Sequence, residues 1–171
     1  MSKSGAMGDA TGGRAAGLAK LKELVERIRV GLLTTVDLDG ILHTRPIETL
    51  RCDADGTLWF FTDHQSPKAN EVSHDMRVSV GYSEPAKNIY VAIAGRARIL
   101  RDRALAAELW IPTQRAWYPK GLEDEHLSIL RVDLERAEYW ERGGRASYLL
   151  AALTAAVTGK QAAVGVDRKL P

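Results

Sequence analysis

The chain has 171 residues, of which 45% are hydrophobic, and its formal net charge is +2. This length suits one domain with tails, and the nearly balanced charge argues against a strongly electrostatic partner such as duplex DNA. The single cysteine, Cys52, excludes an internal disulfide and fits a reducing cytosol. No apolar run approaches the roughly 20 residues of a membrane span, and the N-terminus lacks the apolar segment of a signal peptide. We therefore expect a cytoplasmic globular domain without a membrane or nucleic-acid partner.

The pattern of hydrophobic residues divides the chain into one domain and two tails. Residues 1–14 are small and Gly-rich, which predicts a disordered lead-in. Over residues 15–29, leucine, valine and isoleucine recur at helical spacing and predict an amphipathic helix. This helix opens a domain that covers residues 15–160, and we expect residues 161–171 to form a loose tail.

Six further segments have the alternation and the β-branched or aromatic content of strands: 31–37, 41–52, 57–62, 76–84, 88–100 and 126–141. Asp39-Gly40 and the turn at 53–56 predict hairpins, and Gly95 marks a bend in the fifth strand. Helices are predicted over residues 66–74, 104–110 and 147–157. Because most connections are hairpins, the sheet should be largely antiparallel. Six such strands suggest a closed or nearly closed barrel with helices at its rim.

The stretch WFFTDHQSPK, residues 59–68, runs from a strand through a polar turn into the first turn of a helix. Ser66 suits the N-cap and Pro67 suits the first helical position. One interpretation is a capped helix with solvated charges. The other is an anion site, because a helix N-terminus offers unpaired N–H groups and a partial positive charge.

Four side chains favour the anion interpretation. Lys68 adds a full charge at the helix tip, and Thr62 and Ser66 add hydroxyl donors. If the strands on either side of the 53–56 turn pair symmetrically, Arg45 lies opposite positions near 63–65 and arrives beside the same tip. Two cations, two hydroxyls and a helix tip together predict a site for a mononucleotide phosphate.

Other residue types give weaker signals. The four histidines have no ligand-like spacing with each other or with Cys52, so we predict no metal site. Trp59 is best interpreted as core packing, whereas Trp140 precedes a Gly-Gly turn, where an indole could border a ligand ring. No side chain is identified as a general acid or base, and the catalytic residues stay unknown.

Five strings follow one another in order along the chain: LLTTVDLDG-ILHTRPIET, DGTLWFFTDHQSPKANEV, MRVSVGYSEPAKNIYVAIAGRARILRD, ELW-IPTQRAWYPKG and LRVDLERAEYW. From about residue 20 to about 160, the sequence resembles the general stress protein branch of the pyridoxamine 5'-phosphate oxidase-like family. The resemblance implies an FMN-binding split β-barrel of mainly β structure with flanking helices. It also implies a homodimer with the flavin at the subunit interface.

The resemblance assigns cofactor roles to individual residues. It places the phosphate ligands at Arg45, Thr62, Ser66 and Lys68, the four positions that the spacing argument had grouped. Other residues should contact the flavin ring. Pro46 and Ile47, in the strand after the arginine, and Phe61 and Thr62, at the end of the following strand, would contact the ring through their backbone. Asn88 and Trp140 would reach the ring from the partner subunit.

One departure from the family pattern bears on activity. True pyridoxamine phosphate oxidases follow the tryptophan with an Arg and a His that grip the substrate, whereas Trp140 is followed by Glu-Arg-Gly-Gly-Arg-Ala-Ser. We therefore do not expect efficient oxidation of pyridoxamine phosphate. The expected function is a stress-related, FMN-dependent oxidoreductase with a nicotinamide donor and a small-molecule redox partner. The alternatives are a non-catalytic FMN store or sensor, and a reductase that uses a deazaflavin.

Overall fold

A computed structural model describes residues 7–141 and 166–170 of the chain. Its helices are α1 (Met7–Ile28), α2 (Pro67–His74) and α3 (Arg103–Leu109), with short 3-10 turns η1 (Pro85–Lys87), η2 (Pro112–Ala116) and η3 (Gly121–Glu123). The predicted helix at 147–157 lies outside the described residues. Among the described residues, no helix is both long enough and apolar enough to cross a membrane.

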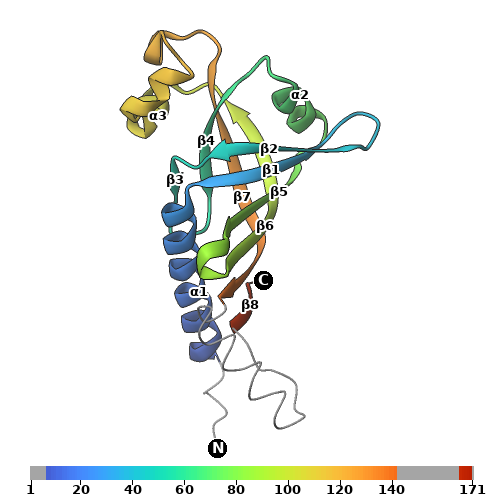
Figure 1. Cartoon of the computed structure of the whole chain (residues 1–171), viewed down its shortest axis with the longest axis vertical. Helices are drawn as coiled ribbons and strands as arrows, with labels where there is room; N and C mark the ends of the chain where they lie inside the picture. Colours follow the sequence, from blue (N-terminus) through green and yellow to red (C-terminus); the bar gives the residue numbers. More distant parts are fainter. Residues whose placement is uncertain (1–6, 142–165, 171) are drawn as a thin grey trace, which may run out of the picture.

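The eight described strands form one antiparallel sheet (Figure 1). They are β1 (Val30–Val36), β2 (Leu42–Glu48), β3 (Arg51–Cys52), β4 (Leu58–Asp63), β5 (Arg77–Glu84), β6 (Ile89–Leu100), β7 (Leu127–Glu141) and β8 (Val166–Leu170). The spatial order is β2-β1-β5-β6-β7-β4-β3, and β8 pairs with the end of β7. The sheet curls as a split β-barrel, so the predicted fold class is confirmed with a slightly different strand number.

The second predicted strand segment, 41–52, is two strands with different partners. Its first part, β2, pairs with β1 so that Arg45 lies opposite Leu33, and only its last residues pair with β4 through the 53–56 turn. The expectation that Arg45 lies opposite positions 63–65 is therefore wrong. Because β2 and β3 are adjacent in sequence but occupy the two ends of the strand order, the chain between them curls the sheet towards closure.

Gly95 marks an irregularity in the long β6–β7 pair, as the sequence predicted. The register shifts between Ala94 and Gly95, since Ala94 pairs with Arg136 and Gly95 with Leu134. An added Cβ at Gly95 would lie 2.3 Å from the carbonyl oxygen of Asp133. The close approach of the two backbones explains why a glycine occupies this position.

Two clusters of buried side chains hold the sheet and its helices together. The larger cluster fills the inside of the sheet and includes Leu21, Leu24 and Val25 of α1. The smaller one lies beneath α3 and the loops after it, around Trp59 and Phe61. The interpretation of Trp59 as a core residue is thus confirmed, with 7% of it exposed.

Both ends of the chain contain more structure than the sequence indicated. α1 begins at Met7 and so extends into the predicted lead-in, residues 1–14. Within the tail 161–171, which we expected to be loose, residues 166–170 pair with 137–141 as β8. Partners so far apart in sequence leave no local periodicity from which the pairing could be predicted.

Candidate functional site

A pocket of about 390 Å³ opens between the β1–β2 hairpin, α2 and the loops that follow α3. Its walls are mostly aliphatic and aromatic, with few polar groups, and are formed by Val30, Pro46, Ile47, Glu48, Phe61, Lys68, Gln114, Trp117 and Tyr118. Pockets of this size and character commonly hold small organic ligands. Four of the predicted site residues thus meet in one place: Pro46, Ile47, Phe61 and Lys68.

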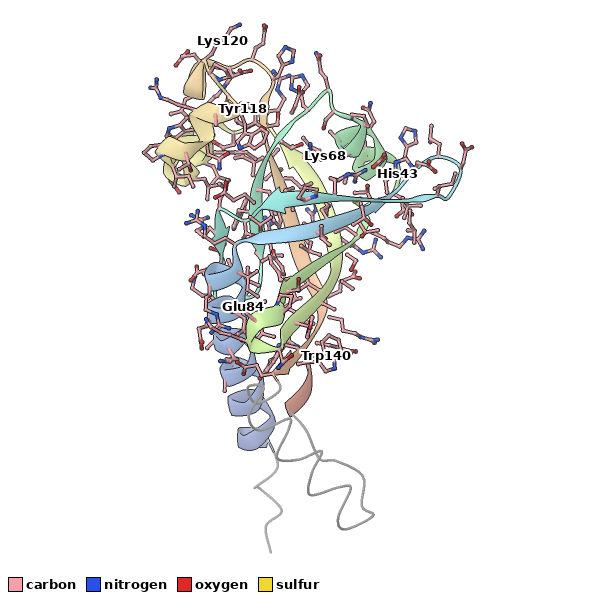
Figure 2. All side chains as sticks on the ribbon, viewed as in Figure 1. His43, Lys68, Glu84, Tyr118, Lys120 and Trp140 are labelled. Atoms are coloured by element: carbon pink, nitrogen blue, oxygen red, sulfur yellow. The ribbon has the colours of Figure 1, made fainter. Side chains whose placement is uncertain are left out.

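Lys68 is the cation of this pocket (Figure 2). Its partial burial lowers the pKa of its ammonium group below the usual range, and the nearby positive charge of Arg45 adds to this effect. Asp63 and Glu71 act in the opposite direction without outweighing it. No carboxylate in the described part of the chain forms a salt bridge with Lys68. An anionic ligand would therefore relieve an unfavourable charge at this position.

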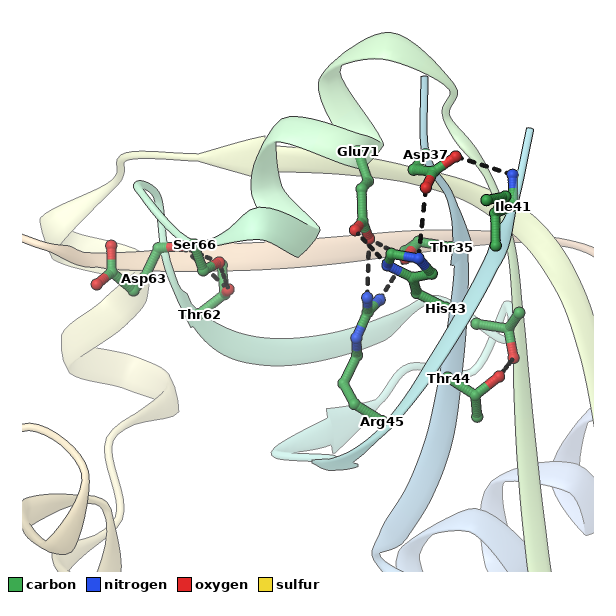
Figure 3. A network of polar contacts seen from close by, with 11 residues as sticks. Thr35, Asp37, Ile41, His43, Thr44, Arg45, Thr62, Asp63, Ser66 and Glu71 are labelled. Carbon is green, nitrogen blue, oxygen red and sulfur yellow. Dashed lines mark hydrogen bonds and ion pairs between the residues drawn. The ribbon is translucent and has the colours of Figure 1, made fainter. Parts of the chain in front are cut away.

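Thr62 and Ser66 stand together at the tip of α2, where Figure 3 shows them facing each other. Their hydroxyl oxygens are 3.4 Å apart, and the Ser66 hydroxyl donates to the carbonyl oxygen of Asp63 at 2.6 Å. Ser66 occupies the N-cap position, as predicted, but its side chain makes no capping hydrogen bond. Pro67 has no N–H, and the N–H of Lys68 lies in a first turn that provides no intrahelical carbonyl. The helix tip therefore has donor capacity for a ligand.

Arg45 lies near Lys68 but is already paired. Its guanidinium contacts Glu71 of α2 at 2.8 Å and also donates to the Thr35 hydroxyl. Glu71 accepts a hydrogen bond from Thr35 as well, and it lies 3.0 Å from His43 (Figure 3). Arg45 thus lies near the tip of α2, as predicted, but its charge is compensated by Glu71, a carboxylate that was not among the predicted site residues.

Glu71 is ionised in this network. Only 8% of its side chain is exposed, and burial alone would raise the pKa of its carboxyl group. The hydrogen bonds from Thr35 and Arg45, with the positive charge of Arg45, outweigh that cost and lower the pKa below its usual range. Glu71 therefore fixes Arg45 and the β1–β2 hairpin against α2.

Asn88 and Trp140 lie in the part of the molecule that is remote from the pocket. Trp140 pairs with Tyr90 near the end of the β6–β7 ladder, and Asn88 precedes that strand in a left-handed conformation with φ 54°. Figure 2 shows Trp140 at one end of the molecule and Lys68 towards the other. Neither residue reaches the pocket of its own chain, so their assigned contacts across a dimer stay a prediction.

The loop after α3 contributes pocket residues that the sequence analysis did not assign. Gln114 donates to Glu48 at 2.8 Å, and Phe61 packs edge-to-face against Tyr118, with ring centroids 6.1 Å apart. Trp117 is 76% exposed at the pocket wall. Burial raises the pKa of the Tyr118 hydroxyl above its usual range, so this group keeps its proton. The adjacent Trp117-Tyr118 pair, in a segment without periodicity, is the sequence feature that could have indicated this wall of the pocket.

The fold also brings together three potential metal ligands that are distant in sequence. One ligand atom each of Asp63, His64 and His126 lies within 4.8 Å of the other two. The prediction of no metal site used spacing along the chain, and spacing cannot detect a pair of histidines that only the β4–β7 ladder brings together.

Known proteins resemble this chain in sequence and in fold. The family described as pyridoxamine 5'-phosphate oxidase like matches residues 17–163. General stress protein 26 of Bacillus subtilis (strain 168) is 29% identical over 120 residues, which cover 68% of this chain and 82% of that protein. Protein bli-3 of Neurospora crassa is 24% identical over 121 residues, and the match spans 65% of this chain but only 58% of bli-3.

Solved structures of related proteins resemble this chain as well. A putative general stress protein 26 from Jannaschia sp. CCS1 has a TM-score of 0.72 at 22% identity, covering 90% of this chain and 98% of that one, and so shows the fold. The general stress FMN/FAD binding protein of Xanthomonas citri has a TM-score of 0.61 at 28% identity, covering 72% of this chain and 87% of that one. The match of the family over most of the chain, on this fold, shows that the chain belongs to the pyridoxamine 5'-phosphate oxidase like family.

Proposed function

We propose that this chain binds FMN in the described pocket and acts as a flavin-dependent oxidoreductase that takes electrons from a nicotinamide donor. The observation that carries the proposal is Lys68, a partly buried cation in the wall of a largely apolar pocket. FMN has a matching polarity, because it joins a flat tricyclic ring to a terminal phosphate. The description of the Xanthomonas citri protein as FMN/FAD binding supports the same ligand class.

The residues present fit such a ligand. Pro46, Ile47 and Phe61 provide an apolar wall that excludes water from a ring. Lys68 and the hydroxyls of Thr62 and Ser66 would bind the phosphate at the tip of α2. When bound, the flavin supplies the redox chemistry, and the protein contributes position and electrostatics.

Among the described residues that line the pocket, none is arranged as a general acid or base. Glu48 is held by Arg29 at 3.2 Å and by Gln114 at 2.8 Å, and the Tyr118 hydroxyl keeps its proton. This observation favours an activity that depends on the cofactor alone. It also supports the second candidate, an FMN store or sensor without turnover, and it gives no support to pyridoxamine phosphate oxidation.

A homodimer is part of the proposal. The outer surface of β1 exposes Val30 by 55% and Leu32 by 52%, and Val30 also lines the pocket. We propose a two-fold dimer through this surface, in which Asn88 and Trp140 of one chain lie against the pocket of the other. Such an arrangement would give the otherwise distant pair the contact that the family pattern assigns to it.

The experiment is a flavin titration followed by reduction. The absorbance spectrum of the purified protein distinguishes a flavin from a deazaflavin, and apoprotein is then titrated with FMN, FAD and riboflavin. We expect FMN to bind most tightly, and we expect NADH or NADPH to bleach the bound flavin without air and oxygen to restore it. Equal affinity for FMN and riboflavin would contradict the phosphate site. Tight FMN binding without bleaching would assign the store or sensor role instead.

A further inference from the structure

A cluster of two histidines and one aspartate lies where β4 ends and β7 begins, on the far side of the α2 tip from Arg45. β4 and β7 pair with Asp63 opposite Leu127, and the backbone N–H of His64 donates to the carbonyl oxygen of His126 at 3.1 Å. The two imidazole rings are stacked, with centroids 5.7 Å apart and planes 24° apart. We propose that Asp63, His64 and His126 bind a divalent first-row transition cation such as Zn²⁺.

The orientation of His64 is the first argument. Its Nδ1 lies 3.1 Å from the carbonyl oxygen of His126. A carbonyl oxygen only accepts, so the neutral ring carries its proton on Nδ1 and keeps the lone pair on Nε2. Metal-binding histidines are commonly oriented in this way, with the second ring nitrogen donating to a backbone carbonyl. His64 is therefore held in a tautomer that leaves its Nε2 lone pair free for a metal.

The unsatisfied nitrogen of His126 is the second argument. Its Nδ1 is shielded from solvent and has no hydrogen-bond partner among the described residues. On this side of the ring lies Asp63, whose Oδ1 is 4.0 Å from Nδ1 and accepts from the backbone N–H of Gln65 at 2.7 Å. Glu125 lies 4.0 Å from the other ring nitrogen, Nε2. A polar atom without a partner is uncommon in a folded protein, and a cation between Asp63 and His126 would satisfy it.

The donor set selects the class of cation. Two imidazoles and one carboxylate suit Zn²⁺ and its neighbours, whereas Mg²⁺ and Ca²⁺ prefer oxygen ligands. Bond lengths of about 2.0–2.2 Å require the three ligand atoms to move closer than their present separations. The side chains of Asp63 and His126 are 45% and 41% exposed, so rotation towards a common centre meets little steric resistance. Their exposure also leaves room for water as a further ligand.

Zn²⁺ titration of the purified full-length protein, in competition with a chromophoric chelator, tests the site. We expect one equivalent per chain with a dissociation constant on the order of 10 µM. His126→Ala and His64→Ala should each weaken binding by about 10-fold or more. His74→Ala is the matched control, because this exposed histidine on α2 lies outside the cluster and its Nδ1 is 3.1 Å from the carbonyl oxygen of Asn70. This variant should bind Zn²⁺ like the wild type.

A second measurement avoids any effect of the substitutions on folding. In NMR spectra of the wild type, Zn²⁺ should shift the ring signals of His64 and His126 and leave those of His43 and His74 unchanged, whereas Mg²⁺ should shift none. No binding below about 1 mM would overturn the proposal. So would an equal loss of affinity in His74→Ala and His126→Ala, or ring shifts confined to His43 and His74.

Discussion

At the scale of single residues, Lys68 and Arg45 were both predicted to bind the phosphate, but only Lys68 lacks a carboxylate partner among the described residues. Arg45 is compensated by Glu71 at 2.8 Å, whereas Lys68 has no such partner in the described part of the chain. A charge-assisted bond to phosphate contributes about 1.5–3 kcal/mol. Lys68→Ala should therefore weaken FMN binding by roughly 10–100-fold and leave riboflavin binding nearly unchanged. Fluorescence titration of apoprotein with each flavin measures both constants.

The control for Lys68→Ala is Lys120→Ala, which removes an exposed cation that does not line the pocket. That variant should bind both flavins like the wild type. An FMN affinity of Lys68→Ala within twofold of the wild-type value would remove the phosphate site from the proposal.

Ser66→Ala removes a different interaction from the helix cap that the sequence predicted. Its side chain makes no cap, so the substitution loses a bond to the Asp63 carbonyl instead of helix capping.

Glu71 gives the pocket region a dependence of stability on pH. Its folded-state pKa lies below the usual value for a glutamate, so its contribution is present above the unfolded-state pKa and is lost as the pH falls through the folded-state pKa. Glu71→Gln should lower the free energy of unfolding by about 1–3 kcal/mol at pH 7. The difference from wild type should shrink below the ordinary glutamate pKa of about 4.3. Urea denaturation at several pH values measures it.

Glu135→Gln provides the comparison. Glu135 pairs with Arg96 at 2.7 Å, but both side chains are 52% exposed, and exposed pairs contribute little to stability. Its substitution should change the free energy of unfolding less than Glu71→Gln does at pH 7. If the two variants were equally stable at pH 7, or if the Glu71→Gln difference did not depend on pH, the network around Arg45 would not stabilise the fold.

At the scale of secondary structure, local patterns predicted where strands and helices lie but not which strands pair. The alternation in residues 41–52 is the same whether a strand pairs with its predecessor or its successor, and the structure uses both partners. The break falls at Thr49, whose N–H donates to the carbonyl oxygen of Arg29. Arg45 still reaches α2, but it does so through the β1–β2 hairpin and the curl of the sheet.

Gly95 permits a test of the β6–β7 irregularity. A methyl group there would lie 2.3 Å from the backbone oxygen of Asp133, and backbone cannot rotate away as a side chain can. Gly95→Ala should therefore lower the free energy of unfolding by about 1–3 kcal/mol. Gly81→Ala is the matched strand control, because the atom nearest to its added Cβ, the carbonyl oxygen of Val91, is 3.9 Å away. Gly81 lies on the outer face of the sheet next to Leu32, so both variants are compared at one protein concentration. Guanidinium denaturation compares the two. A Gly95→Ala variant as stable as Gly81→Ala would show that the strands can separate without cost.

At the scale of the whole molecule, the predictable part of the site is the part that belongs to a motif. Ser66 and Lys68 lie two residues apart on one helix tip, so the sequence alone groups them. Trp117 and Tyr118 reach the pocket from a loop without periodicity, and the approach of His64 to His126 requires the β4–β7 ladder. The Trp117-Tyr118 pair is visible in the sequence, but the residues that these side chains meet depend on the tertiary fold and cannot be predicted from a local pattern.

The proposed dimer is also a property of the whole molecule. Leu32, Gly81 and Ala92 form a row across β1, β5 and β6 on the outer face of the sheet, opposite the buried row that contains Leu33, Val80 and Ile93. Leu32→Asp would place an unpaired charge in a buried interface, which costs several kcal/mol. We expect this variant to be monomeric by light scattering at micromolar concentration and folded, because Leu32 is already 52% exposed within one chain.

Flavin affinity connects this variant to the site. If Asn88 and Trp140 complete the pocket of the partner subunit, the Leu32→Asp monomer should lose FMN affinity, although every residue of its own pocket is intact. Leu38→Asp introduces the same charge at a position that is 76% exposed in the β1–β2 turn, and it should stay dimeric and bind FMN like the wild type. A wild-type protein that is monomeric with flavin bound would refute the shared site. A monomeric Leu32→Asp that binds FMN normally would separate dimerisation from flavin binding.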